Sequence, residues 1–209
     1  MALSSKALQQ KRTKKAAKKK GGKMPGASVR TGIPDVWLAA ANAPIADVYT
    51  PEGLFETGLG TVWFSRRLED GRYAVSAFLV DTYCLGVKNA MYNIFPPDHY
   101  HAELEKFLQR SSEQFNARDA AYARKLVELA VAYAHQLGIE PHADYKIAKL
   151  IFGDVDASSC EVTFSFGRDG SPCYISGPGD TPADHRRILK QLEKARKDPL
   201  ALLTAGFDD

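Results

Sequence analysis

Cysteine is scarce in this sequence, which has only Cys84, Cys160 and Cys173 in 209 residues. Their number is odd and they form no Cys-x-x-Cys pair, so the chain lacks both a disulfide framework and the usual spacing of a structural zinc site. It also has no apolar run of about 18 residues and no apolar signal-peptide core near its start. These absences favour a cytoplasmic protein with reduced thiols and no membrane-spanning helix.

Acidic residues are missing from residues 1–30. Of the 28 Lys or Arg in the chain, ten lie in this arm and 18 follow it, where all 25 Asp or Glu also lie. The arm therefore has a formal charge of +10 and the rest of the chain a charge of −7. Strong self-repulsion and the near absence of apolar side chains predict a disordered basic tail.

The arm has a high density of positive charges, which can bind the phosphates of a nucleic acid. Its bases gather at Lys11, Arg12, Lys14, Lys15, Lys18, Lys19, Lys20 and Lys23. Such charges neutralise phosphates and release counterions without recognising a base sequence, which favours nucleic acid or a ribonucleoprotein as the partner. The alternative is a solubilising arm with no specific partner. A membrane surface is disfavoured, because no bulky apolar residues interleave with the lysines.

The remaining residues are 31–209, and apolar residues make up 44% of the chain. That is enough for one domain with a substantial core. We therefore predict a disordered basic tail over residues 1–30, a single domain over residues 31–198 and a C-terminal extension over residues 199–209.

Two β-hairpins are predicted. In the first, residues 61–67 and 73–81 are rich in β-branched and aromatic side chains and flank Asp70-Gly71, the strongest short hairpin signal. In the second, residues 161–166 alternate apolar and polar side chains, and the turn over residues 168–171 leads back into residues 173–176.

Helices are predicted around and between the hairpins, over residues 34–42, 99–110, 119–137 and 144–152 and from Thr181 onward. The longest shows Tyr122, Leu126, Leu129, Tyr133 and Leu137 at three- and four-residue steps. The last begins with Thr181 as its cap, Pro182 at its first position and Asp184 at the capping-box position. This order predicts an α+β fold in which the hairpins form one antiparallel sheet with helices on one face.

The end of the first hairpin holds the candidates for catalysis. Cys84 follows Asp81 by three residues, and Lys88 follows Cys84 by four. A nearby ammonium can favour the thiolate needed for nucleophilic attack. The alternative is a buried structural cysteine, because unpaired cysteine is among the most commonly buried residue types.

An anion site is suggested by Gly177, Gly179 and Thr181, which place glycine backbone beside a helix N-terminus. This arrangement binds phosphate or carboxylate. Helix capping by Thr181 explains the same pattern without a ligand.

We predict no metal or cofactor. His99 and His101 are two residues apart on a predicted helix, so they point in nearly opposite directions and cannot share an ion. The pair Gly58 and Gly60 precedes a strand and opens no helix, unlike a dinucleotide fingerprint.

Two segments resemble known sequences: FLVDTYCLGVK over residues 78–88 and FGRDGSPCYISGP over residues 166–178. They are similar to a group of small bacterial proteins with no assigned activity. The likeness extends over most of the chain after the tail, including Gly58-Leu59-Gly60 and the turn around His142. It implies a bacterial origin and supplies no activity, cofactor or catalytic residue.

The sequence therefore leads to two functional hypotheses. The first is a non-enzymatic accessory protein that contacts nucleic acid or a ribonucleoprotein through its basic arm, while the acidic domain contacts another protein. The second is a small cysteine-dependent hydrolase or transferase that uses Cys84 and Asp81 at the end of the first hairpin.

Overall fold

The computed structural model of the protein describes residues 33–109, 114–177 and 179–197. From Pro34 onward these residues belong to one structural unit. The predicted basic tail (1–30) and C-terminal extension (199–209) lie outside the described residues.

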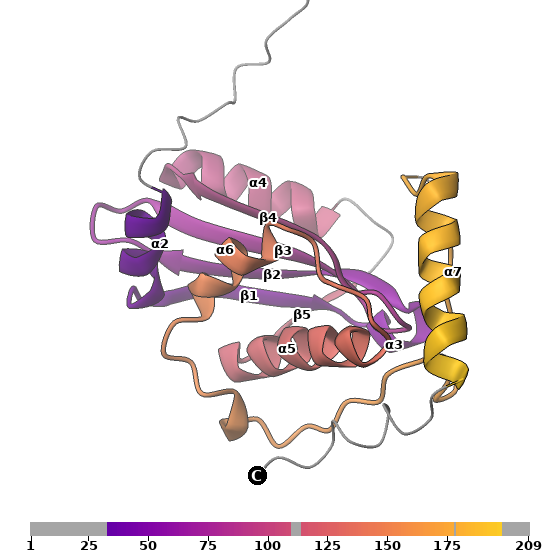
Figure 1. Cartoon of the computed structure of the whole chain (residues 1–209). Helices are drawn as coiled ribbons and strands as arrows, with labels where there is room; N and C mark the ends of the chain where they lie inside the picture. Colours follow the sequence, from indigo (N-terminus) through magenta and orange to yellow (C-terminus); the bar gives the residue numbers. More distant parts are fainter. Residues whose placement is uncertain (1–32, 110–113, 178, 198–209) are drawn as a thin grey trace, which may run out of the picture. The chain divides into compact units, whose positions relative to one another are not determined.

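An antiparallel sheet of five strands organises this unit (Figure 1). The strands are β1 (Ile45–Pro51), β2 (Leu59–Arg67), β3 (Tyr73–Asp81), β4 (Gly86–Phe95) and β5 (Phe115–Ala117). Their order in the sheet is β4-β3-β2-β1-β5. The first four strands form a meander in which each pairs with the next along the chain, whereas β5 returns to the far edge and pairs with β1.

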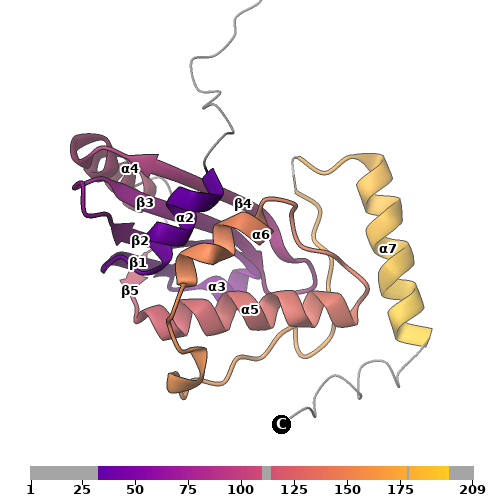
Figure 2. The ribbon, with the colours of Figure 1, turned by 60° about the vertical axis from the view of Figure 1, so that its left-hand side comes forward.

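Helices lie against both faces of the sheet. They are α2 (Ile33–Ala41), α3 (Leu54–Thr57), α4 (Pro97–Gln109), α5 (Ala120–Gln136), α6 (Tyr145–Ala148) and α7 (Pro182–Lys197), with short 3₁₀ turns η1 (Lys149–Phe152) and η2 (Ala157–Ser159). Figures 1 and 2 show α2, α5 and α6 on one face and α4 on the other. The predicted α+β class with an antiparallel sheet is confirmed, although helices cover two faces and not one.

The alternation of side chains along β2 and β3 produces a core on each face. On the face of α5 and α6, Phe64 and Phe78 are fully buried and contact the ring of Phe152 from η1, with centroids 5.3 and 5.2 Å away. On the face of α4, Trp63 stacks on Phe107 at 5.0 Å and also packs near Tyr100. The central strands are therefore buried on both sides, which fixes their register.

Arg66 on β2 ties three parts of the chain together at one corner of the sheet. Its guanidinium donates to the carbonyl oxygens of Ile151 at 2.7 Å, Ala43 at 2.6 Å and Phe152 at 2.8 Å. The residue is only 3% exposed, and this burial lowers the pKa of Arg66 although Asp154 opposes the shift. The carbonyl bonds satisfy a charge that would otherwise be costly to bury.

Three strands were not predicted, and two predicted strands are absent. Strands β1, β4 and β5 were missed, so the first hairpin is part of a four-strand meander. The predicted second hairpin forms its turn, with a bridge between Arg168 and Ser171, but residues 161–166 and 173–176 make no ladder. The apolar alternation there has another cause: Phe164 stacks on Phe55 of α3 and Phe166 stacks on Tyr133 of α5.

The buried face of α5 also differs from the predicted one. Leu126 is fully buried as expected, but Leu129 is 38% exposed. The buried face consists of Ala123, Leu126, Val127, Ala130, Val131 and Ala134. The predicted residues Leu126 and Leu137 are buried, but alanines and valines occupy the rest of the inner side, so the bulky residues alone do not mark it.

Candidate functional site

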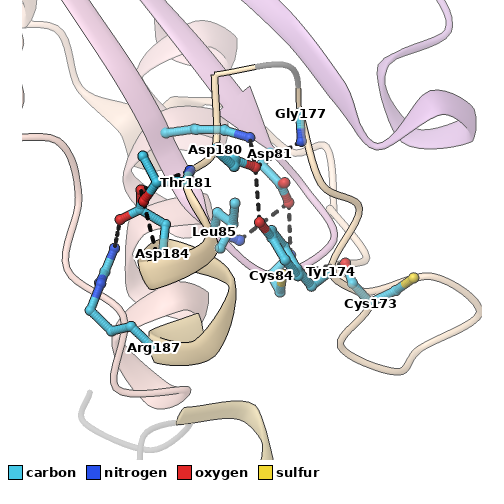
Figure 3. A network of polar contacts seen from close by, with 11 residues as sticks. Asp81, Cys84, Leu85, Cys173, Tyr174, Gly177, Asp180, Thr181, Asp184 and Arg187 are labelled. Atoms are coloured by element: carbon cyan, nitrogen blue, oxygen red, sulfur yellow. Dashed lines mark hydrogen bonds and ion pairs between the residues drawn. The ribbon is translucent and has the colours of Figure 1, made fainter. Parts of the chain in front are cut away.

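Asp81 organises the connection between β3 and β4. Its Oδ1 atom accepts hydrogen bonds from the backbone amides of Tyr83 at 2.9 Å, Cys84 at 2.8 Å and Leu85 at 3.2 Å. Figure 3 shows Asp81 with Cys84 and Leu85. Burial raises the pKa of Asp81, although these amide bonds and the charge of Lys88 oppose the shift. Asp81 is 5% exposed and its Oδ1 atom accepts the three amide bonds of the turn, so the contacts explain Asp81 as a structural residue.

Cys84 lies inside a small apolar cluster. It is fully buried, and its Sγ donates to the carbonyl oxygen of Cys173 at 3.3 Å. The cluster contains Cys84, Leu85, Ala134, Leu137, Ile139 and Ile188. Burial raises the pKa of the Cys84 thiol, the charges of Asp81 and Cys173 raise it further, and the lowering effect of Lys88 is smaller. These surroundings oppose the thiolate that nucleophilic catalysis requires.

Lys88 forms an ion pair with a carboxylate that is distant in sequence, that of Asp180. Its Nζ lies 2.8 Å from Oδ2 of Asp180, which also accepts from the hydroxyl of Tyr174 at 2.9 Å and the amide of Gly177 at 2.7 Å. Partial burial acts to raise the pKa of Asp180, but these three hydrogen bonds outweigh it and lower the pKa to about 2. Asp180 therefore fastens the loop before α7 to β4.

The same loop contains the predicted anion site. Thr181 and Asp184 form the predicted capping box, in which Thr181 N donates to Asp184 Oδ2 at 3.1 Å and Asp184 N donates to Thr181 Oγ1 at 3.2 Å. The amide of Gly177 is already bonded to Asp180, and Gly179 has open space around it. An external anion would have to compete with two internal carboxylates, so the anion site remains a prediction.

The structure thus brings Asp81, Cys84 and Lys88 to one end of the sheet, beside the loop that leads into α7. Sequence reasoning did not identify Asp180 or Tyr174 as their neighbours. Figure 3 shows the sulfur of Cys173 pointing away from Cys84. His185 packs edge-on against Tyr174 at 5.4 Å.

Within residues 33–109, 114–177 and 179–197, no group of three His, Cys, Asp or Glu side chains is placed to hold a metal ion. His99 instead lies 3.6 Å from Glu103. In the same part of the chain, every helix is too short or too polar to cross a bilayer.

The fold and these contacts define an α+β protein with a five-stranded antiparallel sheet, whose β3–β4 connection is held by the loop before α7. Comparison with family models, curated proteins and solved structures finds no match. The resemblance to small bacterial proteins remains a prediction.

Labelling of the three thiols tests the structural role of Cys84. Because Cys84 is buried and its thiol pKa is raised, we expect iodoacetamide to modify it at least about tenfold more slowly than half-buried Cys173 in the native protein. The measurement is mass spectrometry of time-resolved digests, with the urea-unfolded chain as the control in which all three thiols react alike. Rapid stoichiometric labelling of native Cys84 would favour the cysteine-dependent enzyme.

Proposed function

We propose that this protein is a non-enzymatic accessory protein that binds nucleic acid, free or within a ribonucleoprotein, through the basic arm of residues 1–30. The observation that carries the proposal is the charge of the arm, which holds ten Lys or Arg and no acid. Phosphate neutralisation with counterion release is the interaction that such a segment favours.

The arm should bind with little preference for base sequence. Its dense part, residues 11–23, offers point charges with a single arginine and no aromatic side chain. It therefore lacks a set of bidentate or stacking groups with which to read bases. If about six to eight charges meet phosphates of a duplex, the slope of log K against log salt lies near −5 to −7.

Two features of the domain support a non-enzymatic role. The only thiol that sequence reasoning selected, Cys84, is buried and hydrogen-bonded to a carbonyl oxygen. The lysine expected to activate it, Lys88, is bonded to Asp180 instead. The chain after residue 30, with its charge of −7, is available for contact with a protein partner.

Neutralising the arm in the full-length chain tests the proposal. Replacing Lys14, Lys15, Lys18 and Lys19 by glutamine should flatten the salt slope by about 3 to 4 and weaken binding to a fluorescent duplex, as measured by anisotropy. A chain whose residues 1–30 are scrambled at constant composition is the matched control and should keep its affinity. Unchanged affinity in the glutamine variant would refute the proposed role of the arm.

A further inference from the structure

Helix α7 carries a second concentration of positive charge, in the part of the chain that the structure describes. It holds six Lys or Arg against two acids, Asp184 and Glu193. At about 100° per residue, five of these bases fall within an arc of about 100° on the helix. They are Arg186, Arg187, Lys190, Lys194 and Lys197, and all five are exposed; we call them the α7 basic stripe.

The opposite side of α7 is already packed. Ile188 is 4% exposed, and Leu192 and Ala195 are partly buried against the cluster that contains Cys84 and Leu137. Figure 2 shows α7 at the edge of the described structure, beyond the end of α5. The docking of its apolar side turns the basic stripe outward.

The acids of α7 do not cancel the stripe. Asp184 is bonded to Thr181 in the capping box and lies 3.5 Å from Arg187, and Glu193 lies 3.8 Å from Lys197. By contrast Arg186, Lys190 and Lys194 make no ion pair with any residue that the structure describes. Three exposed cations therefore remain on one side of the helix.

We infer that the α7 basic stripe is a second phosphate-binding surface, which contacts the backbone of the same nucleic acid as the arm. The inference rests on the proposed function, because it takes its partner from there. From Arg186 to Lys197 the stripe extends over about 16 Å, and a duplex carries one negative charge per about 1.7 Å of its axis. Several phosphates are thus within its reach.

An anionic bilayer is the other partner that a basic amphipathic helix suits. Such a helix inserts its apolar side between lipids while its bases contact the headgroups. In α7 Ile188, Leu192 and Ala195 pack against the domain, while Leu189 is 55% exposed. Insertion of the packed apolar residues into a bilayer would first require the helix to detach. A nucleic acid needs only the side that is already exposed.

A charge-matched pair of full-length variants provides the test. The stripe variant carries Arg186→Gln, Lys190→Gln and Lys194→Gln. The control carries Arg67→Gln, Lys106→Gln and Lys146→Gln, which remove three exposed bases from β2, α4 and α6. If the stripe contacts phosphates, its variant loses at least about tenfold in affinity for a 20-base-pair duplex and its salt slope flattens by about 3. Equal behaviour of the two variants would overturn the inference.

Lysine acetylation distinguishes failure of this inference from failure of the proposed arm contact. In the wild-type protein, duplex should protect Lys190 and Lys194 from an acetylating reagent, while exposed Lys106 and Lys146 stay reactive. Protection of the arm lysines without protection of Lys190 and Lys194 would support the arm proposal and contradict the inference that the α7 basic stripe binds phosphate. Protection of Lys190 and Lys194 without protection of the arm lysines would support the α7 contact and contradict the proposed arm contact. Binding to phosphatidylserine vesicles with no protection by duplex would show that a bilayer is the partner.

Discussion

The Arg66→Met variant is expected to lose about 4 kcal/mol of unfolding free energy, because three buried carbonyl oxygens lose their charged donor at once. These oxygens belong to Ala43, Ile151 and Phe152. Methionine retains much of the apolar stem but cannot donate to any of them. Urea denaturation followed by circular dichroism measures the change.

Two controls separate the carbonyl bonds from charge effects in general. Arg67 is the next residue on β2 and is exposed, so Arg67→Met should change stability by less than about 0.5 kcal/mol. Asp154 lies 3.5 Å from Arg66 but its side chain is 81% exposed, so Asp154→Asn should also have a small effect. If Asp154→Asn costs as much as Arg66→Met, the ion pair and not the carbonyl bonds holds this corner.

Gly153→Ala should be as damaging as the loss of Arg66, and the variant is expected to lose about 4 kcal/mol or to fail to fold. Gly153 has φ 53° and ψ −123°, a conformation that costs little only for glycine. An added Cβ would also collide with the carbonyl group of Ala41, whose carbon it would approach to 2.7 Å. The position of the Cβ is fixed by the backbone of residue 153 and the group that it meets is the backbone of Ala41, so no side-chain rotation can relieve the clash.

Two other glycines separate the two causes of the expected stability loss in Gly153→Ala, which are backbone strain and the clash with Ala41. Gly71 has φ +82° with open space around it, and Gly179 has open space without a positive φ. We expect Gly71→Ala to lose about 1 kcal/mol from backbone strain alone and Gly179→Ala to be neutral or slightly stabilising. Thermal unfolding ranks the three variants, and proteolytic resistance of freshly expressed protein covers the case in which Gly153→Ala does not fold. A Gly153→Ala protein as stable as Gly71→Ala would show that α2 and η1 can separate without loss.

Local patterns were sufficient where a segment's structure depends on its own residues. The hairpin of β2 and β3 follows from alternating apolar residues around Asp70-Gly71, and the start of α7 follows from Thr181, Pro182 and Asp184. Strand β4 was missed because Lys88, Asn89 and Asn93 interrupt its apolar pattern, yet β3 supplies its hydrogen-bond partners. A ladder can hold polar residues in a strand when the neighbouring strand is already in place.

Residues 161–166 are the opposite case, with a strand-like sequence and no ladder. The apolar positions Phe164 and Phe166 are used to contact rings of α3 and α5, and this choice depends on the positions of those helices. Here the alternation marks Phe164 and Phe166 as side chains that make contacts, but it does not identify the hydrogen-bond partner of the backbone.

The candidate site was predictable in part for the same reason. Asp81, Cys84 and Lys88 are neighbours in sequence, and the structure keeps them together at the end of β3. The partner of Lys88 is Asp180, which is 92 residues away. No local pattern could identify that pairing. Because Lys88 binds Asp180, it holds the loop before α7 and does not activate Cys84 as the sequence suggested.

The meander has a consequence for biosynthesis. Strands β1 to β4 end at Phe95 and each pairs with its successor, so these strands can assemble while the chain is still leaving the ribosome. The elements that cover Phe64 and Phe78, namely α5 and η1, are translated later and end at Phe152. Between these two points the nascent sheet displays aromatic side chains to solvent, and such surfaces drive aggregation and chaperone binding. We therefore expect aggregation and chaperone binding to be favoured while residues 96–152 are translated.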